Sequence, residues 1–206
     1  MDRYRVIRPQ SGPPSAIPTV IFALLVINGV AFAAQNLLAG QLPLIGYLAL
    51  WSLDSGLFLP FQLLTYGFLH GNLWHLALNL FMLWMFGRNI EHVWGQRRFL
   101  IYYLVCVVGA GLTQLVVGAL QGGAYPTVGA SGGVFGLLLA YGMLFPEQRI
   151  MLLFPPIPLK AKYMVVLFGL FTLAYGISGA MPGVAHFAHL GGMVFGLALI
   201  LVWRRR

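Results

Sequence analysis

Charged residues are scarce in this sequence. They make up 8% of its 206 residues, and only four are Asp or Glu, whereas 60% of the residues are hydrophobic. A soluble domain has about 25% charged residues, so this chain has too few to cover a surface in water. The shortage excludes a soluble globular protein and a disordered chain. Together with a mean hydropathy of +0.86, it indicates a protein that crosses a membrane several times.

Cysteine is almost absent as well. Cys106 is the only one, so no internal disulfide can form and a disulfide-stabilised scaffold is excluded.

Basic residues are missing from three long segments, 9–87, 99–148 and 163–203. The twelve Lys and Arg form four groups of three, which lie between and beside these segments. A net charge of +8 could suggest nucleic-acid binding, but this grouping between apolar segments explains the charge better, so we do not expect a nucleic-acid partner. The groups are Arg3, Arg5 and Arg8; Arg88, Arg97 and Arg98; Arg149, Lys160 and Lys162; and Arg204, Arg205 and Arg206.

Apolar stretches predict an all-α membrane protein with six transmembrane helices. A helix needs about 20 residues to cross the hydrocarbon core, and the six stretches are close to that length. They cover roughly 18–38, 72–87, 99–120, 131–145, 163–179 and 186–203. The segment 42–69 is also apolar, but Pro and Gly interrupt it, so we expect an interfacial loop with short helical pieces between spans one and two. Residues 1–16 form an N-terminal tail and 17–206 the six-span domain.

The basic groups set the expected orientation, because Lys and Arg prefer short cytoplasmic loops. With six spans all four groups lie on one side, whereas a further span within 42–69 would move Arg88, Arg97 and Arg98 to the other side. We therefore expect both termini in the cytoplasm and the chain in the inner cell membrane. Ala31-Phe32-Ala33 resembles a signal-peptide cleavage site, but the apolar run continues beyond it, so we expect an uncleaved first span.

Polar side chains stand at the beginning of spans two, four and six. Polar groups within spans are costly and usually functional. These three spans run in the same direction, so the polar residues meet on the non-cytoplasmic side. The residues are His70, His75 and Asn79 in span two, Ser131 in span four, and His186 and His189 in span six.

Glycine pairs predict which helices touch. Gly132 and Gly136 in span four, and Gly192 and Gly196 in span six, form GxxxG pairs of the kind that lets helices approach closely. Packing them together would bring Ser131 near the histidines. Because span four is short, Ser131 should lie below the membrane surface, in a water-filled pocket open to the non-cytoplasmic side.

A serine beside a histidine suggests nucleophilic catalysis, with the histidine as general base and then general acid. Ser131 at a helix N-terminus has free backbone N–H groups that suit an oxyanion, and His75 and Asn79, on one helical face, can supply further donors. Only one acid, Asp54, lies on the same side, so a Ser–His dyad is more consistent with the sequence than a triad.

His189 is favoured over His186 as the base. Ser131 is 14 residues from the inner end of its span at Phe145, and His189 is 14 residues from the inner end of its own span at Trp203. Both then lie about 21 Å above that boundary, whereas His186 lies about 4.5 Å further out.

The same residues could have a structural or a metal-binding role instead. Serine at a helix start is commonly an N-cap, and four histidines on one side could bind a metal. No HExxH motif, carboxylate or thiolate accompanies the histidines, so we expect neither a metal nor another cofactor.

At these residues the sequence resembles the rhomboid family of intramembrane serine proteases. The matching motifs are GASG at 129–132, the His-x4-His-x3-Asn pattern of His70, His75 and Asn79, and AHLGGMVFG at 188–196. The resemblance implies a serine endopeptidase in the lipid bilayer, with Ser131 as nucleophile and His189 as base, that cleaves single-span membrane proteins near helix-breaking residues on the outer side.

The resemblance also implies roles for other residues. It assigns His75, Asn79 and the Ser131 backbone amide to the oxyanion site, with His70, Gly129 and Gly132 in support. It makes Phe135 a ring stacked on the catalytic histidine and Glu91 a structural residue. Phe61-Gln62 departs from the Trp-Arg of some members, so the anchoring of the first loop could differ.

Two other functions compete with the protease. One is a catalytically silent relative that binds and escorts membrane proteins; such relatives typically lack the Ser or His that this chain has. The other is a transporter or a metal-binding channel. Labelling of Ser131 by a fluorophosphonate would separate the protease from both.

Overall fold

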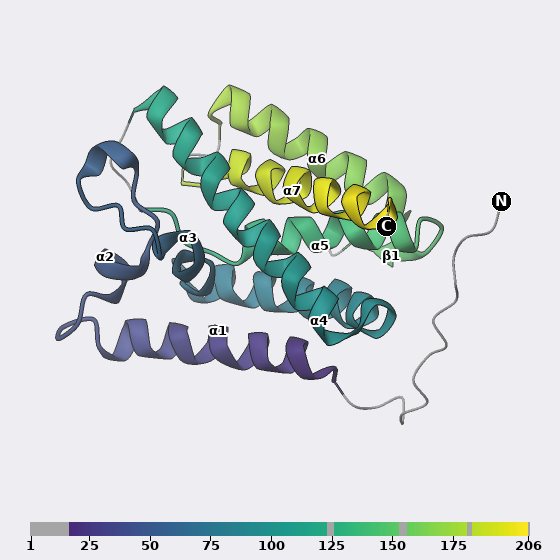
Figure 1. Cartoon of the computed structure of the whole chain (residues 1–206), viewed down its shortest axis with the longest axis horizontal. Coiled ribbons are helices and arrows are strands. Elements are labelled where there is room, and N and C mark those ends of the chain that lie inside the picture. The colour runs from purple at the N-terminus through teal and green to yellow at the C-terminus, as the bar shows by residue number, and fades with distance from the viewer. Residues whose placement is uncertain (1–16, 123–125, 153–155, 181–182, 206) are drawn as a thin grey trace.

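The protein folds into a bundle of helices, and the computed structural model describes residues 17–122, 126–152, 156–180 and 183–205 (Figure 1). The helices are α1 (Thr19–Leu37), α2 (Leu44–Leu48), α3 (Gln62–Thr65), α4 (Leu73–Gln121), α5 (Ser131–Leu144), α6 (Ala161–Ser178) and α7 (His186–Arg204). Two 3-10 turns, η1 (Leu53–Ser55) and η2 (Tyr66–Phe68), and two strands, β1 (Arg149–Met151) and β2 (Pro158–Lys160), complete the elements. The predicted tail 1–16 lies outside the described residues.

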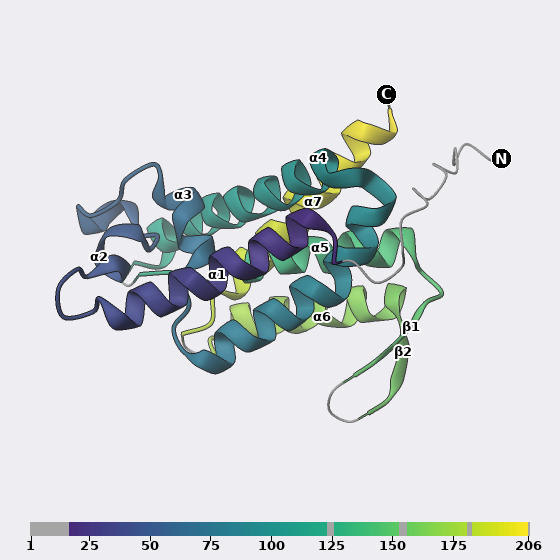
Figure 2. The same cartoon turned by 90° about the horizontal axis from the view of Figure 1, so that it is seen from below.

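Helix α4 is two helices joined at Gly95. This glycine has φ 76° and ψ 165°, a backbone conformation that other residues rarely adopt. The chain reverses direction there, and the second half of α4 runs back from the turn at an angle to the first half (Figure 2). The segment 88–98, which we expected to be a loop, is therefore helical except at this glycine, and the basic residues Arg88, Arg97 and Arg98 lie on either side of the turn.

Four helices in the described residues, α1, α4, α6 and α7, are long and apolar enough to cross a membrane. Helix α5 is apolar but has only 14 residues. A mostly helical membrane protein is thus confirmed, while the count of six spans stays a prediction.

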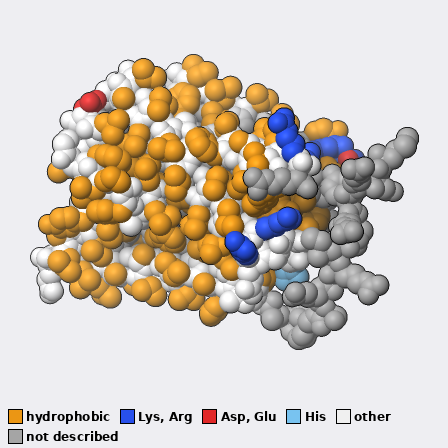
Figure 3. Space-filling view, in the orientation of Figure 1, with side chains coloured by type: hydrophobic (Ala, Val, Ile, Leu, Met, Phe, Trp, Pro, Cys, Tyr) orange, Lys and Arg blue, Asp and Glu red, His pale blue; other side chains and the backbone are white. Residues whose placement is uncertain are grey.

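The surface agrees with a membrane environment. Hydrophobic side chains cover most of the face in Figure 3, and Lys and Arg gather toward the end where the C-terminus and β1 lie. We call this end, which includes Arg88, Arg97, Arg98 and Arg204, the basic end. Helix α1 begins there and α7 ends there (Figure 1).

Glu91 holds α1 in place at the basic end. Its buried carboxylate accepts hydrogen bonds from the backbone N–H groups of Val20, at 3.0 Å, and Ile21, at 2.9 Å. The first N–H groups of a helix have no partner within the helix and carry partial positive charge. A carboxylate at this point therefore fixes α1 against α4, which is consistent with the structural role expected for Glu91.

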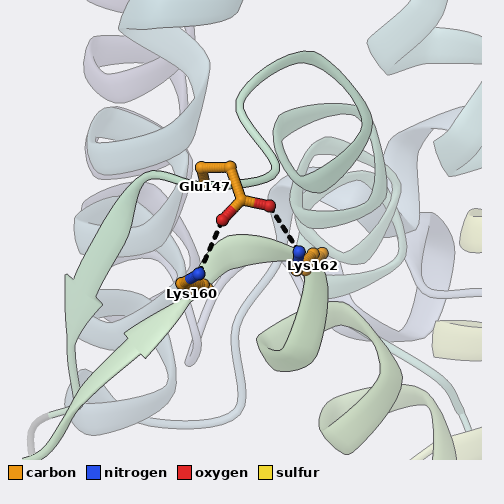
Figure 4. A network of polar contacts seen from close by, with 3 residues as sticks. All are labelled: Glu147, Lys160 and Lys162. Atoms are coloured by element: carbon orange, nitrogen blue, oxygen red, sulfur yellow. Dashed lines mark hydrogen bonds and ion pairs between the residues drawn. The ribbon is translucent and has the colours of Figure 1, made fainter.

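A small hairpin, β1–β2, connects α5 and α6, and sequence patterns did not predict it. Arg149 pairs with Lys160 and Met151 with Pro158. Glu147 bonds both Lys160, at 2.7 Å, and Lys162 (Figure 4). The bonds to these two ammonium groups lower the pKa of Glu147 from 4.5 to about 2, so the carboxylate stays charged and continues to bridge the base of the hairpin down to low pH.

Candidate active site

Ser131 and His189 meet between α5 and α7. The Ser131 hydroxyl Oγ lies 2.8 Å from His189 Nε2, across 58 residues of sequence. Ser131 is the first residue of α5, but the N-cap is Ala130 and no side chain caps this helix. The serine hydroxyl therefore contacts the histidine instead of serving as an N-cap. His189 is buried and Ser131 partly exposed, so the hydroxyl is accessible while the base is shielded.

Glycines bring the two helices together, as their spacing predicted. A side chain at Gly192 of α7 would collide with the backbone carbonyl of Gly132 on α5, and one at Gly136 would lie 3.2 Å from the Gly192 carbonyl. Gly196 packs instead against Tyr102 of α4, whose hydroxyl donates a 2.8 Å hydrogen bond to the Gly136 carbonyl. Backbone contact between α5 and α7 thus places Ser131 and His189 within hydrogen-bond distance.

The His189 ring is held from one face by Phe135. The two rings are parallel to within 4°, with centroids 4.2 Å apart, as expected for the residue one turn after Ser131. His189 Nδ1 is buried without a hydrogen-bond partner among the described residues. Among the described residues no carboxylate bonds to this ring, so its observed support is the stacking against Phe135.

His186 lies one turn from His189 on α7, and it is His189 that makes the 2.8 Å contact with the Ser131 hydroxyl. Its ring is 6.2 Å from the His189 ring, edge to face, and 5.9 Å from that of Tyr175. The described residues contain no group of three His, Cys, Asp or Glu placed to hold a metal ion. Independence of metal stays a prediction.

His75 lies beside Ser131 across Gly129. A Cβ at Gly129 would be 2.8 Å from His75 Nε2 and 3.6 Å from Ser131 Oγ. With φ 131° and this crowding, the position requires glycine. Asn72 is the N-cap of α4, and its side chain accepts a 2.8 Å hydrogen bond from the His75 N–H. This bond fixes the first turn of the helix, which carries His75.

Asn79 is buried one turn below His75, but its side chain points back along its own helix. Its Nδ2 donates a 2.8 Å hydrogen bond to the His75 carbonyl. This hydrogen bond holds the Asn79 amide on its own helix, so its place in the oxyanion site stays a prediction.

His70 is fully buried, and its ring packs edge-on against His75 with centroids 5.1 Å apart. Gln35 of α1 holds the His70 backbone from both sides: its Oε1 accepts from the His70 N–H at 3.1 Å and its Nε2 donates to the His70 carbonyl at 2.5 Å. Sequence reasoning missed Gln35, because its partners are backbone groups 35 residues away that no side-chain motif marks. The one feature of the sequence that could have pointed to Gln35 is that a polar amide lies within an apolar span.

Gln62 anchors the loop before α4. It is 1% exposed. Its Oε1 accepts from the N–H groups of Trp51 and Leu59, at 3.3 and 3.2 Å, and its Nε2 donates to the carbonyls of Tyr47 and Leu57, both at 3.0 Å. Phe61-Gln62 therefore still provides an anchor for the first loop in this chain, through the Gln62 amide.

The anchored loop holds the segment that leads into Ser131. Leu50 and Thr127 exchange two backbone hydrogen bonds of 3.0 and 2.9 Å, and the Gly129 N–H donates to the Tyr66 carbonyl at 2.9 Å. Segment 126–130, which leads into Ser131, is thus fixed to the loop at two points.

Comparison with known proteins identifies relatives of the chain. Residues 59–206 match the family described as Rhomboid domain. The chain is 31% identical over 154 residues to the presenilin-associated rhomboid-like protein, mitochondrial, of Rattus norvegicus, covering 68% of this chain and 38% of that protein. It is 31% identical over 132 residues to rhomboid protein 1, mitochondrial, of Saccharomyces cerevisiae, covering 63% and 38%. It is 29% identical over 196 residues to the rhomboid protease GluP of Bacillus subtilis, covering 91% and 34%.

These relatives are longer than the chain, which spans between 34% and 38% of their length. They also correct one expectation. An inner cell membrane with cytoplasmic termini was wrong, because the similar proteins of rat, human and yeast are named as mitochondrial.

Proposed function

The chain belongs to the rhomboid family, and we propose that it is an intramembrane serine endopeptidase that uses a Ser131–His189 dyad. The observation that supports this most strongly is the 2.8 Å contact between Ser131 Oγ and His189 Nε2 at the start of a helix. One relative, GluP of Bacillus subtilis, is named a protease.

The proposed reaction follows from this contact. His189 Nε2 accepts the proton as Ser131 Oγ attacks the scissile carbonyl, and it returns that proton to the leaving amine, so that an acyl-enzyme forms. Water then attacks the ester with His189 again as base, which releases the acid and restores the serine. Phe135 keeps the imidazole plane aligned through both steps by stacking against it.

We place the oxyanion at the N-terminal end of α5. The Ser131 backbone N–H is among the first of that helix and lacks an intrahelical acceptor, and the ring of His75 lies within reach across Gly129. The Asn79 amide, now bonded to its own helix, would complete the set by rotating toward the oxyanion. Donors fixed in this way stabilise the charge that develops on the carbonyl oxygen.

Six membrane spans complete the proposed architecture. They are α1, the two halves of α4 on either side of Gly95, α5, α6 and α7. Ser131 then faces the side opposite the basic end, and the substrates are single-span membrane proteins cut near helix-breaking residues on that side. The names of the relatives from rat and yeast favour a mitochondrial membrane.

Fluorophosphonate labelling tests this proposal. The purified chain should gain one covalent adduct that maps to Ser131, and Ser131→Ala should gain none. His189→Ala should react much more slowly, because no base remains to activate the hydroxyl. A wild-type protein that stays unlabelled would favour the alternative, a catalytically silent relative that escorts membrane proteins.

A further inference from the structure

A shallow apolar groove lies between the second half of α4 and α7. Its volume is about 330 Å³, and its lining residues are Leu104, Val105, Val108, Gly109 and Phe195. The Phe195 ring packs against the backbone at Gly109, where any side chain would collide with it. Every lining residue is apolar or glycine, so the groove suits a hydrocarbon chain and offers nothing to a polar ligand.

Arginines stand at the basic end of this groove. Residues seven apart share a face of a helix, so Arg97 lies in line with Leu104 and Arg98 with Val105. The Arg98 guanidinium also lies over the ring of Trp203 on α7, 5.7 Å from its centre. Arg98 therefore sits at the junction of the two helices that form the groove.

Among the described residues, no carboxylate forms an ion pair with the arginines at this end. Arg204 ends α7 and Arg205 caps it, directly after the Trp203 that Arg98 contacts, and Arg97, Arg98, Arg204 and Arg205 are all exposed. Within the described parts of the chain, the ion pairs are those of Glu147 with two lysines of the hairpin. The four arginines are thus free to bind an external anion.

We propose that this groove binds an anionic phospholipid, with one acyl chain along the groove and the phosphate at Arg97 and Arg98. Eleven residues separate Arg98 from Gly109, or about 16 Å along the helix, a length that an acyl chain fills. Basic pockets between transmembrane helices bind anionic headgroups in this way. A second copy of the chain or a substrate helix would fill the groove but would leave the arginines without an anion.

Native mass spectrometry of the purified full chain tests the headgroup. Phosphatidylglycerol should remain bound more tightly than phosphatidylcholine with the same acyl chains. Charge near a membrane surface contributes about a fivefold change in affinity for each arginine, so Arg97→Gln with Arg98→Gln should weaken phosphatidylglycerol binding about 25-fold. Arg88→Gln with Arg149→Gln removes the same charge at the basic end but away from the groove, and should leave binding unchanged.

A second variant tests the acyl-chain site. Val108→Trp narrows the groove and should reduce bound phosphatidylglycerol, whereas Val30→Trp on the exposed surface of α1 should not. Equal binding of the two lipids, or equal effects of the two arginine pairs, would overturn the proposal. So would a dimer that Val108→Trp abolishes, since that would identify a second copy as the occupant. If Val108→Trp fails to fold in a thermal unfolding assay, the arginine pairs decide alone.

Discussion

Among single residues, the two histidines of α7 differ in how they meet Ser131. His189 makes the 2.8 Å contact and stacks on Phe135, while the His186 ring is nearly perpendicular to the His189 ring, 6.2 Å away. We predict that His189→Ala abolishes cleavage, because no base remains within reach of the hydroxyl. His186→Ala should keep most activity. A purified-enzyme cleavage assay measures both, and the reverse pattern would mean that the base lies one turn further out.

Asn79 gives a second prediction at this scale. Loss of one oxyanion donor costs about a hundred- to a thousand-fold in rate. If the Asn79 amide leaves its 2.8 Å bond to the His75 carbonyl during the reaction, Asn79→Ala should lower kcat and change KM little. Steady-state kinetics separate the two constants. A rise in KM alone would instead make Asn79 a substrate-binding or packing residue.

Sequence patterns could predict the Ser131–His189 pair because motif, direction of the spans and depth all agree on it. Counting 14 residues from the inner end of each span placed both side chains at one level, and the GxxxG pairs indicated which helices cross. The orientation of the Asn79 amide could not be predicted this way. It depends on a choice between nearby acceptors that spacing does not determine.

At the scale of elements, the loop before α4 depends on a single buried amide. Gln62→Ala would remove four hydrogen bonds to the backbone at Tyr47, Trp51, Leu57 and Leu59. Leaving buried polar groups unpaired costs about 1–3 kcal/mol each, so the melting temperature should fall and protease cleavage within 44–60 should increase.

The matched control for Gln62 is Gln41→Ala, an exposed glutamine in the same connection. Thermal unfolding in detergent and limited proteolysis compare the two variants. If both behave alike, Gln62 does not hold the loop.

The apolar pattern of the sequence predicted the ends of the long helices to within a residue or two. It did not predict the turn at Gly95 or the hairpin. The predicted span 18–38 corresponds to α1, Thr19–Leu37, and the predicted span 186–203 corresponds to α7, His186–Arg204. The segment 88–98 is polar enough to suggest a loop, yet it is helical up to a single reversal at Gly95. The hairpin β1–β2 is held by pairing between residues and by the bridge of Glu147 to two lysines, neither of which gives a periodic signal.

At the scale of the whole molecule, six spans require that residues near Ile17, Met151 and Arg205 share one side of the membrane. Cysteine accessibility can test this, because native Cys106 is fully buried and should give little background. In sealed vesicles of known orientation, an impermeant maleimide should label Cys at these three exposed positions from one side, and Leu53→Cys from the other. Labelling of Ile17→Cys and Arg205→Cys from opposite sides would contradict an even number of spans.

If Ser131 is the nucleophile for peptide-bond cleavage within the membrane, Ser131→Ala should abolish cleavage without unfolding the bundle. The variant removes one hydroxyl from a partly exposed helix start, so folding should be nearly unchanged in a thermal unfolding assay. In proteoliposomes that contain a single-span substrate with helix-breaking residues, the wild-type chain should produce a cleaved fragment. Ser131→Ala should produce none at the same enzyme concentration. A cleavage rate near wild type for folded Ser131→Ala protein would contradict the account.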